Sequence, residues 1–344
     1  MKTAGSIMGR EIAETPSVYR TIFAHQRQFE SLQNLLLVRK IHTILILARG
    51  TSDNAAFFLK YLIETRLGLP VGLASPSVVS VYGAKLNLSG TLVIAISQSG
   101  QSPDLLSFGS AAKSGGAVLL TMVNATTSPL ENIADYSISL NAGDEVAVAA
   151  TKSYSAQLIA SYLLVSGWAN SRVNESELLA EAEKLLALAP AFESIASKID
   201  LAKQIVILGR GYSFPNAKEA ALKIQETCKT VVQSWSIADY IHGPISSLDH
   251  NSQVIIIAPA FMPKEPLRDA VSRLRPIVDR ITWLGQGGLV EENDFVIPGS
   301  MCEDSALSSI VDAISIQLLT LALSKSAGFD PDVPAGLSKV TLTL

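Results

Sequence analysis

Short apolar runs rich in β-branched residues alternate along the chain with longer segments whose apolar residues recur at helical spacing. In the first half, these runs predict strands at 41–50, 91–97, 117–123 and 136–140. In the second half, they predict strands at 204–211, 252–260, 280–285 and 294–298. Each half ends in a long apolar helical segment, at 153–168 and at 306–324. This alternation is typical of a parallel α/β architecture.

One sequence detail recurs in both halves. Residues 47–52 read LARGTS and residues 208–213 read LGRGYS, and each ends a predicted strand and leads into a predicted helix. Because strands and helices also follow in the same order, we expect two copies of one ~150-residue unit rather than a chance match. We expect a helical arm at 1–40, domains at 41–170 and 201–330, a helical linker at 171–200, and a C-terminal tail at 331–344.

Charge and composition narrow the function classes. The chain has 27 basic and 31 acidic residues and no long basic run, which argues against a nucleic-acid partner. Two cysteines and four scattered histidines predict neither a disulfide scaffold nor a metal site. The N-terminus lacks an apolar signal segment, and the uncharged stretches contain Ser, Gln and Gly. We therefore expect a soluble cytoplasmic protein with no membrane partner and no cofactor.

The segment at 93–107, VIAISQSGQSPDLLS, is the best candidate ligand loop. An apolar strand leads through a Ser- and Gly-rich loop into a predicted helix, and parallel sheets bind ligands at this edge. Hydroxyl and amide groups at the positive end of a helix dipole suit a phosphate. An ordinary Ser-rich helix cap fits the same pattern. No GxxxxGK[ST] motif is present, and GRGYSF at 209–214 has Phe214 where a dinucleotide fingerprint needs Gly or Ala.

The second half contains a charged helical stripe. Glu219, Lys223 and Glu226 lie at i, i+4 and i+7, so the helix places them on one face. A solvated salt-bridge stripe and a functional cluster both fit this spacing. His242 in DYIHGP and Lys339 in the tail are further candidates, although a lone histidine is more often structural.

Several of these segments, in this order, resemble the sugar-isomerase (SIS) domain family, and the isomerase half of glutamine–fructose-6-phosphate aminotransferases in particular. The segments that carry the resemblance are ARGTSDN, SQSGQS, NAGDEVAVAATKSYSAQL, GRGYSFPNAKEAALKIQE, DYIHGP and LSKVTLTL. The likeness extends from about Arg10 to Leu344. It implies two tandem SIS subdomains, each a doubly wound, flavodoxin-like or Rossmann-like parallel sheet in three α/β/α layers.

The resemblance also implies roles for particular residues. The residues implied to bind the sugar phosphate are Gly50, Thr51, Ser52, Ser97, Gln98, Ser99 and Ser102, with Val148 lining the substrate. Glu226 corresponds to the carboxylate that moves a proton between C1 and C2. His242 corresponds to a histidine that assists ring opening from the neighbouring subunit of a homodimer, and Lys339 to a tail lysine that forms a Schiff base with the ketose. Glu219 and Lys223 correspond to supporting residues.

Departures from the family pattern affect the expected substrate. Gln101, Gln225 and Ala150 replace a common Glu, Lys and Ser. Residue 2 is lysine, and neither Cys228 nor Cys302 is placed as the N-terminal nucleophile of a glutaminase, so we expect no ammonia from glutamine.

The expected activity is deamination of an amino-sugar phosphate, with glucosamine 6-phosphate giving fructose 6-phosphate and ammonia. Fructosamine-6-phosphate deglycation, simple aldose–ketose isomerisation and ammonia-dependent synthesis are alternatives. A non-catalytic sugar-phosphate sensor is disfavoured, because a sensor needs the phosphate loop but not the proton shuttle.

Overall fold

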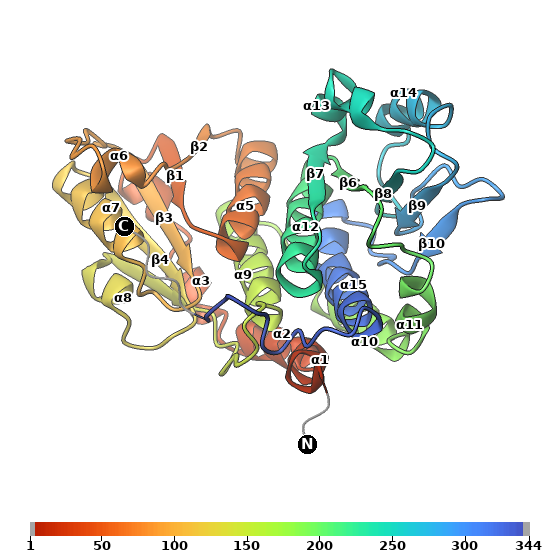
Figure 1. The fold of residues 1–344 in the computed structure, drawn as a ribbon. Helices are drawn as coiled ribbons and strands as arrows, with labels where there is room; N and C mark the ends of the chain where they lie inside the picture. The colour runs from red at the N-terminus through yellow and green to blue at the C-terminus, as the bar shows by residue number, and fades with distance from the viewer. Residues whose placement is uncertain (1–3, 340–344) are drawn as a thin grey trace. The chain divides into compact units, whose positions relative to one another are not determined.

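A computed structural model describes residues 4–339 and divides the chain into two compact units, each built on one sheet (Figure 1). The β1–β5 unit comprises Ser17–Glu145, Lys152–Val173 and the C-terminal residues from Ser338. The β6–β10 unit comprises the N-terminal residues up to Pro16, Val146–Thr151 and Asn174–Leu337. The expected residues 1–3 and 340–344 of the arm and tail lie outside the described residues.

The first sheet contains five parallel strands in the order β2-β1-β3-β4-β5. Its strands are β1 (Thr43–Leu47), β2 (Val71–Leu73), β3 (Thr91–Ser97), β4 (Val118–Val123) and β5 (Tyr136–Ser139). Its helices are α2 (Thr15–Ala24), α3 (Arg27–Glu30), α4 (Leu35–Val38), α5 (Thr51–Leu67), α6 (Ser77–Ser80), α7 (Pro103–Ser114), α8 (Pro129–Ile133) and α9 (Lys152–Trp168). α5 and α9 pack against each other, while α7 packs on β3 and β4 through Leu105, Phe108 and Ala112.

The second sheet repeats this topology in the order β10-β9-β8-β6-β7. Its strands are β6 (Ile205–Gly209), β7 (Val232–Ser236), β8 (Gln253–Ile257), β9 (Ile281–Leu284) and β10 (Phe295–Ile297). Its helices are α1 (Ser6–Ala13), α10 (Glu175–Ala187), α11 (Ala191–Ala196), α12 (Phe214–Cys228), α13 (Ile237–Ile241), α14 (Glu265–Leu274) and α15 (Ser305–Ser326). Two 3₁₀ turns lie at Gly211–Ser213 and Pro244–Ser247.

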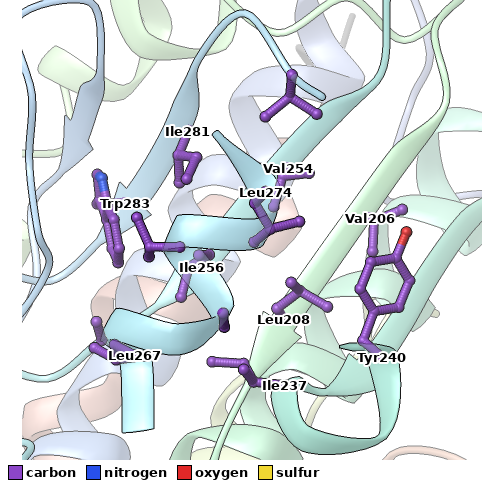
Figure 2. Packing of buried hydrophobic residues seen from close by; sticks show 14 of the residues in the cluster. Val206, Leu208, Ile237, Tyr240, Val254, Ile256, Leu267, Leu274, Ile281 and Trp283 are labelled. Carbon is purple, nitrogen blue, oxygen red and sulfur yellow. The ribbon is translucent and has the colours of Figure 1, made fainter. Parts of the chain in front are cut away.

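An apolar core joins α13 and α14 to one face of the second sheet. Tyr240 of α13 and Leu267 and Leu274 of α14 pack against strand residues such as Ile256 and Trp283 (Figure 2). α12 packs on β6 and against α15, so this unit has three layers. Two parallel sheets with flanking helices confirm the predicted tandem α/β architecture.

Each sheet has one point at which the strand order reverses. In the first sheet it lies between β1 and β3, and in the second between β6 and β8. The turns after β1 and β6 both use a left-handed glycine, Gly50 at φ 58° and Gly211 at φ 59°. Crevices at such reversal points are the usual ligand sites of open parallel sheets.

α15 is a core helix despite its composition. Among the described helices, it alone is long and apolar enough to cross a membrane, and 94% of its most apolar window is buried inside the fold. Most of its polar residues are buried as well, including Asp312 and Gln317.

Candidate functional site

The loop after β3 presents hydroxyl groups at the N-terminus of α7. Ser102 is the N-cap of α7, and its side chain makes no capping hydrogen bond. The Ser97 hydroxyl accepts a hydrogen bond from the Gly100 N–H at 2.9 Å, and the Ser99 hydroxyl accepts one from the Gln101 N–H at 3.3 Å. Each of these two hydroxyls therefore retains its own hydrogen to donate to an anion.

The shape of this loop requires glycine at position 100. Gly100 has φ +62°, and a Cβ at this position would lie 2.3 Å from the Ser128 hydroxyl. Two backbone hydrogen bonds also hold the loop in place. The Gln98 carbonyl accepts the Ala125 N–H at 3.0 Å, and the Gly100 carbonyl accepts the Leu130 N–H at 3.1 Å. Backbone contacts therefore position the loop residues that are predicted to bind the phosphate.

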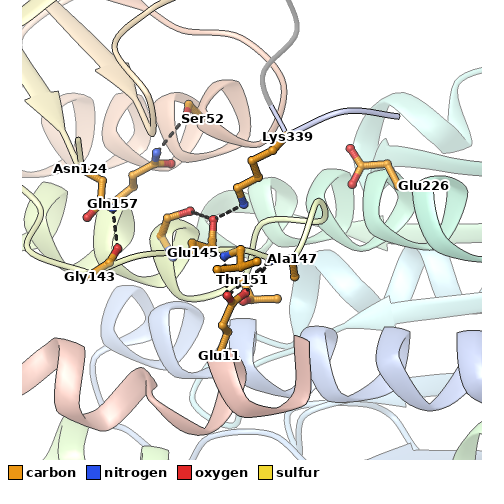
Figure 3. Close-up of polar contacts among 12 residues, drawn as sticks. Glu11, Ser52, Asn124, Gly143, Glu145, Ala147, Thr151, Gln157, Glu226 and Lys339 are labelled. Carbon is orange, nitrogen blue, oxygen red and sulfur yellow. Dashed lines mark hydrogen bonds and ion pairs between the residues drawn. The ribbon is translucent and has the colours of Figure 1, made fainter. Parts of the chain in front are cut away.

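Ser52 lies in the first turn of α5, at the same sheet edge. β1 and β3 are neighbours, with Leu47 paired to Ala95. The buried Ser52 hydroxyl accepts a hydrogen bond of 2.8 Å from the side-chain amide of Gln157 on α9 (Figure 3). Sequence reasoning missed Gln157, although it lies within the SYSAQL segment.

An ion pair ties the two loops of this edge together. Arg49, which precedes Gly50, donates a hydrogen bond of 2.9 Å to Asp104 in the first turn of α7. The hydrogen bond from Arg49 lowers the pKa of Asp104, against the opposing effect of burial. The pair fixes the turn after β1 relative to the turn after β3.

Lys339 lies against a buried carboxylate of the same unit. The Lys339 Nζ atom donates to Glu145 Oε2 at 2.8 Å, and Glu145 also accepts hydrogen bonds from the Ser153 N–H at 3.0 Å and the Ser153 hydroxyl at 2.7 Å (Figure 3). Burial opposes ionisation of Glu145, but the Lys339 charge and the Ser153 hydrogen bonds together lower its pKa. Sequence reasoning did not single out Glu145.

Val148 belongs to the short segment Val146–Thr151 of the β6–β10 unit. Glu11 on α1 accepts hydrogen bonds from the Val146 N–H at 2.5 Å and the Ala147 N–H at 3.3 Å (Figure 3). Gln317 on α15 donates to the Thr151 carbonyl at 2.9 Å. These contacts fix both ends of the segment, and Val148 between them is half-buried.

The charged stripe on α12 is mostly inside the protein. The side chains of Glu219 and Lys223 are 1% and 2% exposed, whereas that of Glu226 is 25% exposed. Lys223 Nζ lies 2.5 Å from Glu226 Oε2 and 3.7 Å from Glu219 Oε1. The solvated-stripe interpretation is therefore wrong for Glu219 and Lys223, because both are withdrawn from water.

His242 is the exposed C-terminal cap of α13, and its backbone N–H donates to the Asp239 carbonyl. No hydrogen bond of its imidazole to another residue is found within 4–339. Over the same residues, no group of three or more His, Cys, Asp or Glu side chains is arranged to hold a metal ion.

Comparison with known proteins shows which family model matches this chain. The model of the SIS domain matches residues 37–167 and 198–265, more than half of the chain. The glutamine–fructose-6-phosphate aminotransferase (isomerizing) of Aquifex aeolicus is 30% identical over 309 residues, which are 88% of this chain and 52% of that protein. The chain spans about half the length of the aminotransferases that it matches.

Solved structures share the fold. A candidate phosphosugar isomerase from Silicibacter pomeroyi DSS-3 is 30% identical, with a TM-score of 0.82 over 94% of this chain and 99% of that one. The glucosamine-6-phosphate deaminase of Thermotoga maritima is 22% identical, with a TM-score of 0.75 over 98% of this chain and 100% of that one. At this lower identity the likeness shows the fold alone.

Proposed function

Because the chain belongs to the SIS domain family, we propose that it is a phosphosugar isomerase-type enzyme and that it deaminates an amino-sugar phosphate. Glucosamine 6-phosphate is the substrate proposed first, giving fructose 6-phosphate and ammonia. The observation that carries the proposal is the α12 cluster, in which a buried lysine holds one partly exposed carboxylate, Glu226.

This cluster is costly as a purely structural feature. Lys223 and Glu219 are both withdrawn from water, and a buried ion pair is weak evidence for stability because desolvation offsets the attraction. The pair does fix the position of Glu226, since Lys223 holds one of its carboxylate oxygens at 2.5 Å. A carboxylate held in one place and open to solvent on one side is suited to proton transfer.

In the proposed reaction, Glu226 takes the proton from C2 of the open-chain amino aldose. The C–H electron pair forms the C1=C2 double bond, and the C1 carbonyl oxygen takes a proton from solvent. Glu226 then returns its proton to C1, which leaves an imine at C2. Water adds to C2, the C–N bond breaks, and the products are ammonia and the ketose phosphate.

The phosphate of the substrate is assigned to the loop after β3. Ser97 and Ser99 are the proposed principal donors, with Gln98, Ser102 and the Gly50–Ser52 turn beside them. Binding of the phosphate, which is remote from C1 and C2, lowers the reaction barrier as well as the dissociation constant. Positioning alone contributes up to roughly 7–11 kcal/mol in well-oriented systems.

Lys339 is proposed to contact the open-chain carbonyl of the ketose. Its ion pair with Glu145 restrains the tail near the carboxyl edge of the first sheet. His242 is proposed to assist ring opening, and its exposed side chain leaves it accessible to another subunit.

The relatives support amino-sugar chemistry in particular. The aminotransferases that match this chain are named for transfer of an amino group to fructose 6-phosphate. Deamination reverses this amination at C2, because water supplies the C2 oxygen and the nitrogen leaves as ammonia. A protein of the same fold, from Thermotoga maritima, is named as a glucosamine-6-phosphate deaminase, which is consistent with the proposal.

One assay tests the proposal. Purified protein is incubated with glucosamine 6-phosphate, galactosamine 6-phosphate, a fructosamine 6-phosphate and fructose 6-phosphate, and ammonia, free amine and aldose are measured. Ammonia release from glucosamine 6-phosphate supports the proposal. Amine release from the fructosamine alone indicates a deglycase, and interconversion of fructose 6-phosphate alone indicates a simple isomerase. Binding of these compounds without turnover indicates a sensor.

A further inference from the structure

We propose that the β6–β10 unit has a second ligand site, which binds a small organic anion with a flat apolar body, such as an aromatic carboxylate. The site is a cavity of about 260 Å³ lined by residues of the same unit. The lining residues are Arg210, Gly211, Tyr212, Ser213, Pro259, Met262, Pro263, Pro266 and Ser305. Its existence does not depend on the proposed deaminase activity.

The cavity occupies the reversal point of the second sheet. Arg210–Ser213 is the turn between β6 and α12, and Pro259–Pro263 follows β8, the strand that neighbours β6. This is the position that the proposed phosphate loop occupies in the first sheet, between β1 and β3. Each sheet therefore has its own crevice where an open parallel sheet binds ligands.

Strand register shows that the two crevices have different chemistry. Leu47 pairs with Ala95 in the first sheet, and the corresponding Leu208 pairs with Ile256 in the second. Two residues later, the first sheet has Ser97 and the second has Ala258; Ser99 corresponds to Ala260. The loop after β8 thus lacks the hydroxyl donors of the phosphate loop, so we do not expect a sugar phosphate here.

The charge balance differs as well. Arg49 in the first turn is neutralised by Asp104, the second residue of α7. The corresponding arginine is Arg210, and the second residue of α14 is Pro266. Within residues 4–339, the Arg210 guanidinium has no ion-pair or hydrogen-bond partner, and Ser213 makes no side-chain cap on α12. A cation and an uncapped helix start beside the cavity favour an anionic ligand.

The remaining walls favour an apolar body. Pro259, Pro263 and Pro266 offer rigid apolar surfaces, and Met262 is a flexible side chain that adapts to ring-shaped ligands. The volume lies just below the ~300–1,000 Å³ of typical drug-sized pockets, which fits a single-ring compound. The Arg210 cation, the apolar walls and the size of the cavity together indicate an aromatic anion as the ligand.

Methionine-methyl NMR tests the proposal at the site itself. The chain has five methionines, so protein labelled with ¹³C-methyl methionine has few signals, and Met262→Leu assigns the relevant one. Benzoate is titrated as the probe. We expect a saturable shift of the Met262 signal, no such shift with inorganic phosphate or benzyl alcohol, and at least five-fold weaker benzoate binding in Arg210→Met. Arg268→Met, an exposed arginine on α14 outside the cavity, is the matched control and should bind benzoate as the wild type does.

Three results would overturn the proposal. The first is a Met262 signal that does not move with benzoate. The second is equal benzoate affinity in Arg210→Met and in the wild type. The third is a shift of the partly exposed Met301 that follows the same titration curve, because this result indicates non-specific binding. A Ser97→Ala, Ser99→Ala double variant should keep benzoate binding, which separates this site from the proposed phosphate loop.

Discussion

Lys339 Nζ lies 2.8 Å from Glu145 Oε2, and the Glu145 carboxylate is fully withdrawn from solvent. The pair joins a tail residue to a residue 194 positions earlier in the chain. Lys339 is therefore part of the folded β1–β5 unit, and not only a proposed contact for the substrate.

A double-mutant cycle measured by urea unfolding tests the contribution of this pair to stability. Lys339→Met removes a charge-assisted hydrogen bond from a buried carboxylate, and we expect a loss of about 1.5–3 kcal/mol in urea unfolding at pH 7. The Glu145→Gln, Lys339→Met double variant should recover most of that loss. Because the pKa of Glu145 is lowered, the contribution of the pair is present above pH ~4 and disappears as pH falls through the folded value. Equal stabilities of wild type and Lys339→Met at pH 7 would contradict this account.

The phosphate loop is tested by its hydroxyls. Ser97→Ala and Ser99→Ala each remove one donor to an anion, with an expected cost of about 1.5–3 kcal/mol in binding. KM for glucosamine 6-phosphate should rise more than tenfold in each variant, and turnover of unphosphorylated glucosamine should not change. Ser114→Ala, at the far end of α7, is the control. An unchanged KM in both loop variants would remove the phosphate assignment.

Most of the fold was predictable, and the two strands that were not predicted share one property. The strands predicted at 91–97 and 117–123 correspond to β3 and β4, which are central and continuously apolar. β2 has only three residues with a central Gly72, and β7 reads VQSWS. Both are edge strands with one neighbouring strand each, so their sequences need not be continuously apolar. The spacing of apolar residues alone therefore does not reveal them.

The sequence predicted the site residues only where the pattern that indicates them lies within one short segment. The Ser97–Ser102 loop and the α12 stripe depend on spacing within one segment, so the sequence indicated them. Gln157 and Glu145 act through contacts with Ser52 and Lys339, 105 and 194 residues away. Without the fold, nothing in the residues around them indicates these partners.

Asp312 predicts an unusual dependence of stability on pH. It is buried on α15, and burial raises its pKa to about 7. The hydrogen bond from the Ser300 N–H lowers the pKa, and the nearby charge of Glu181 raises it. Between pH ~4 and 7 the folded state then keeps a proton that the unfolded state loses. Stability should fall as pH rises through this window, by up to about 1.4 kcal/mol per unit, and level off above pH 7. Asp312→Asn should flatten this slope in urea unfolding at pH 5, 6, 7 and 8; an unchanged slope would exclude Asp312 as its source.

The proposed homodimer with shared sites predicts complementation. Glu226→Gln and His242→Ala chains should each be nearly inactive alone. If the two residues serve one site from different subunits, hybrid dimers of the two chains should recover part of the activity. Mass spectrometry of differently tagged chains verifies subunit exchange. Verified exchange without recovery would contradict sharing.

The central claim is that Glu226 moves a proton between C1 and C2, and exchange of the substrate hydrogen with solvent tests it most directly. Glucosamine 6-phosphate or fructose 6-phosphate is incubated in D₂O, and incorporation of deuterium at C1 and C2 is followed by NMR. Glu226→Gln should lose exchange and turnover together, by about 10²–10⁴-fold, while its affinity for the sugar phosphate stays close to the wild-type value. Lys339→Ala should retain the exchange step better than Glu226→Gln does. Near-normal exchange in a folded Glu226→Gln protein would contradict the account.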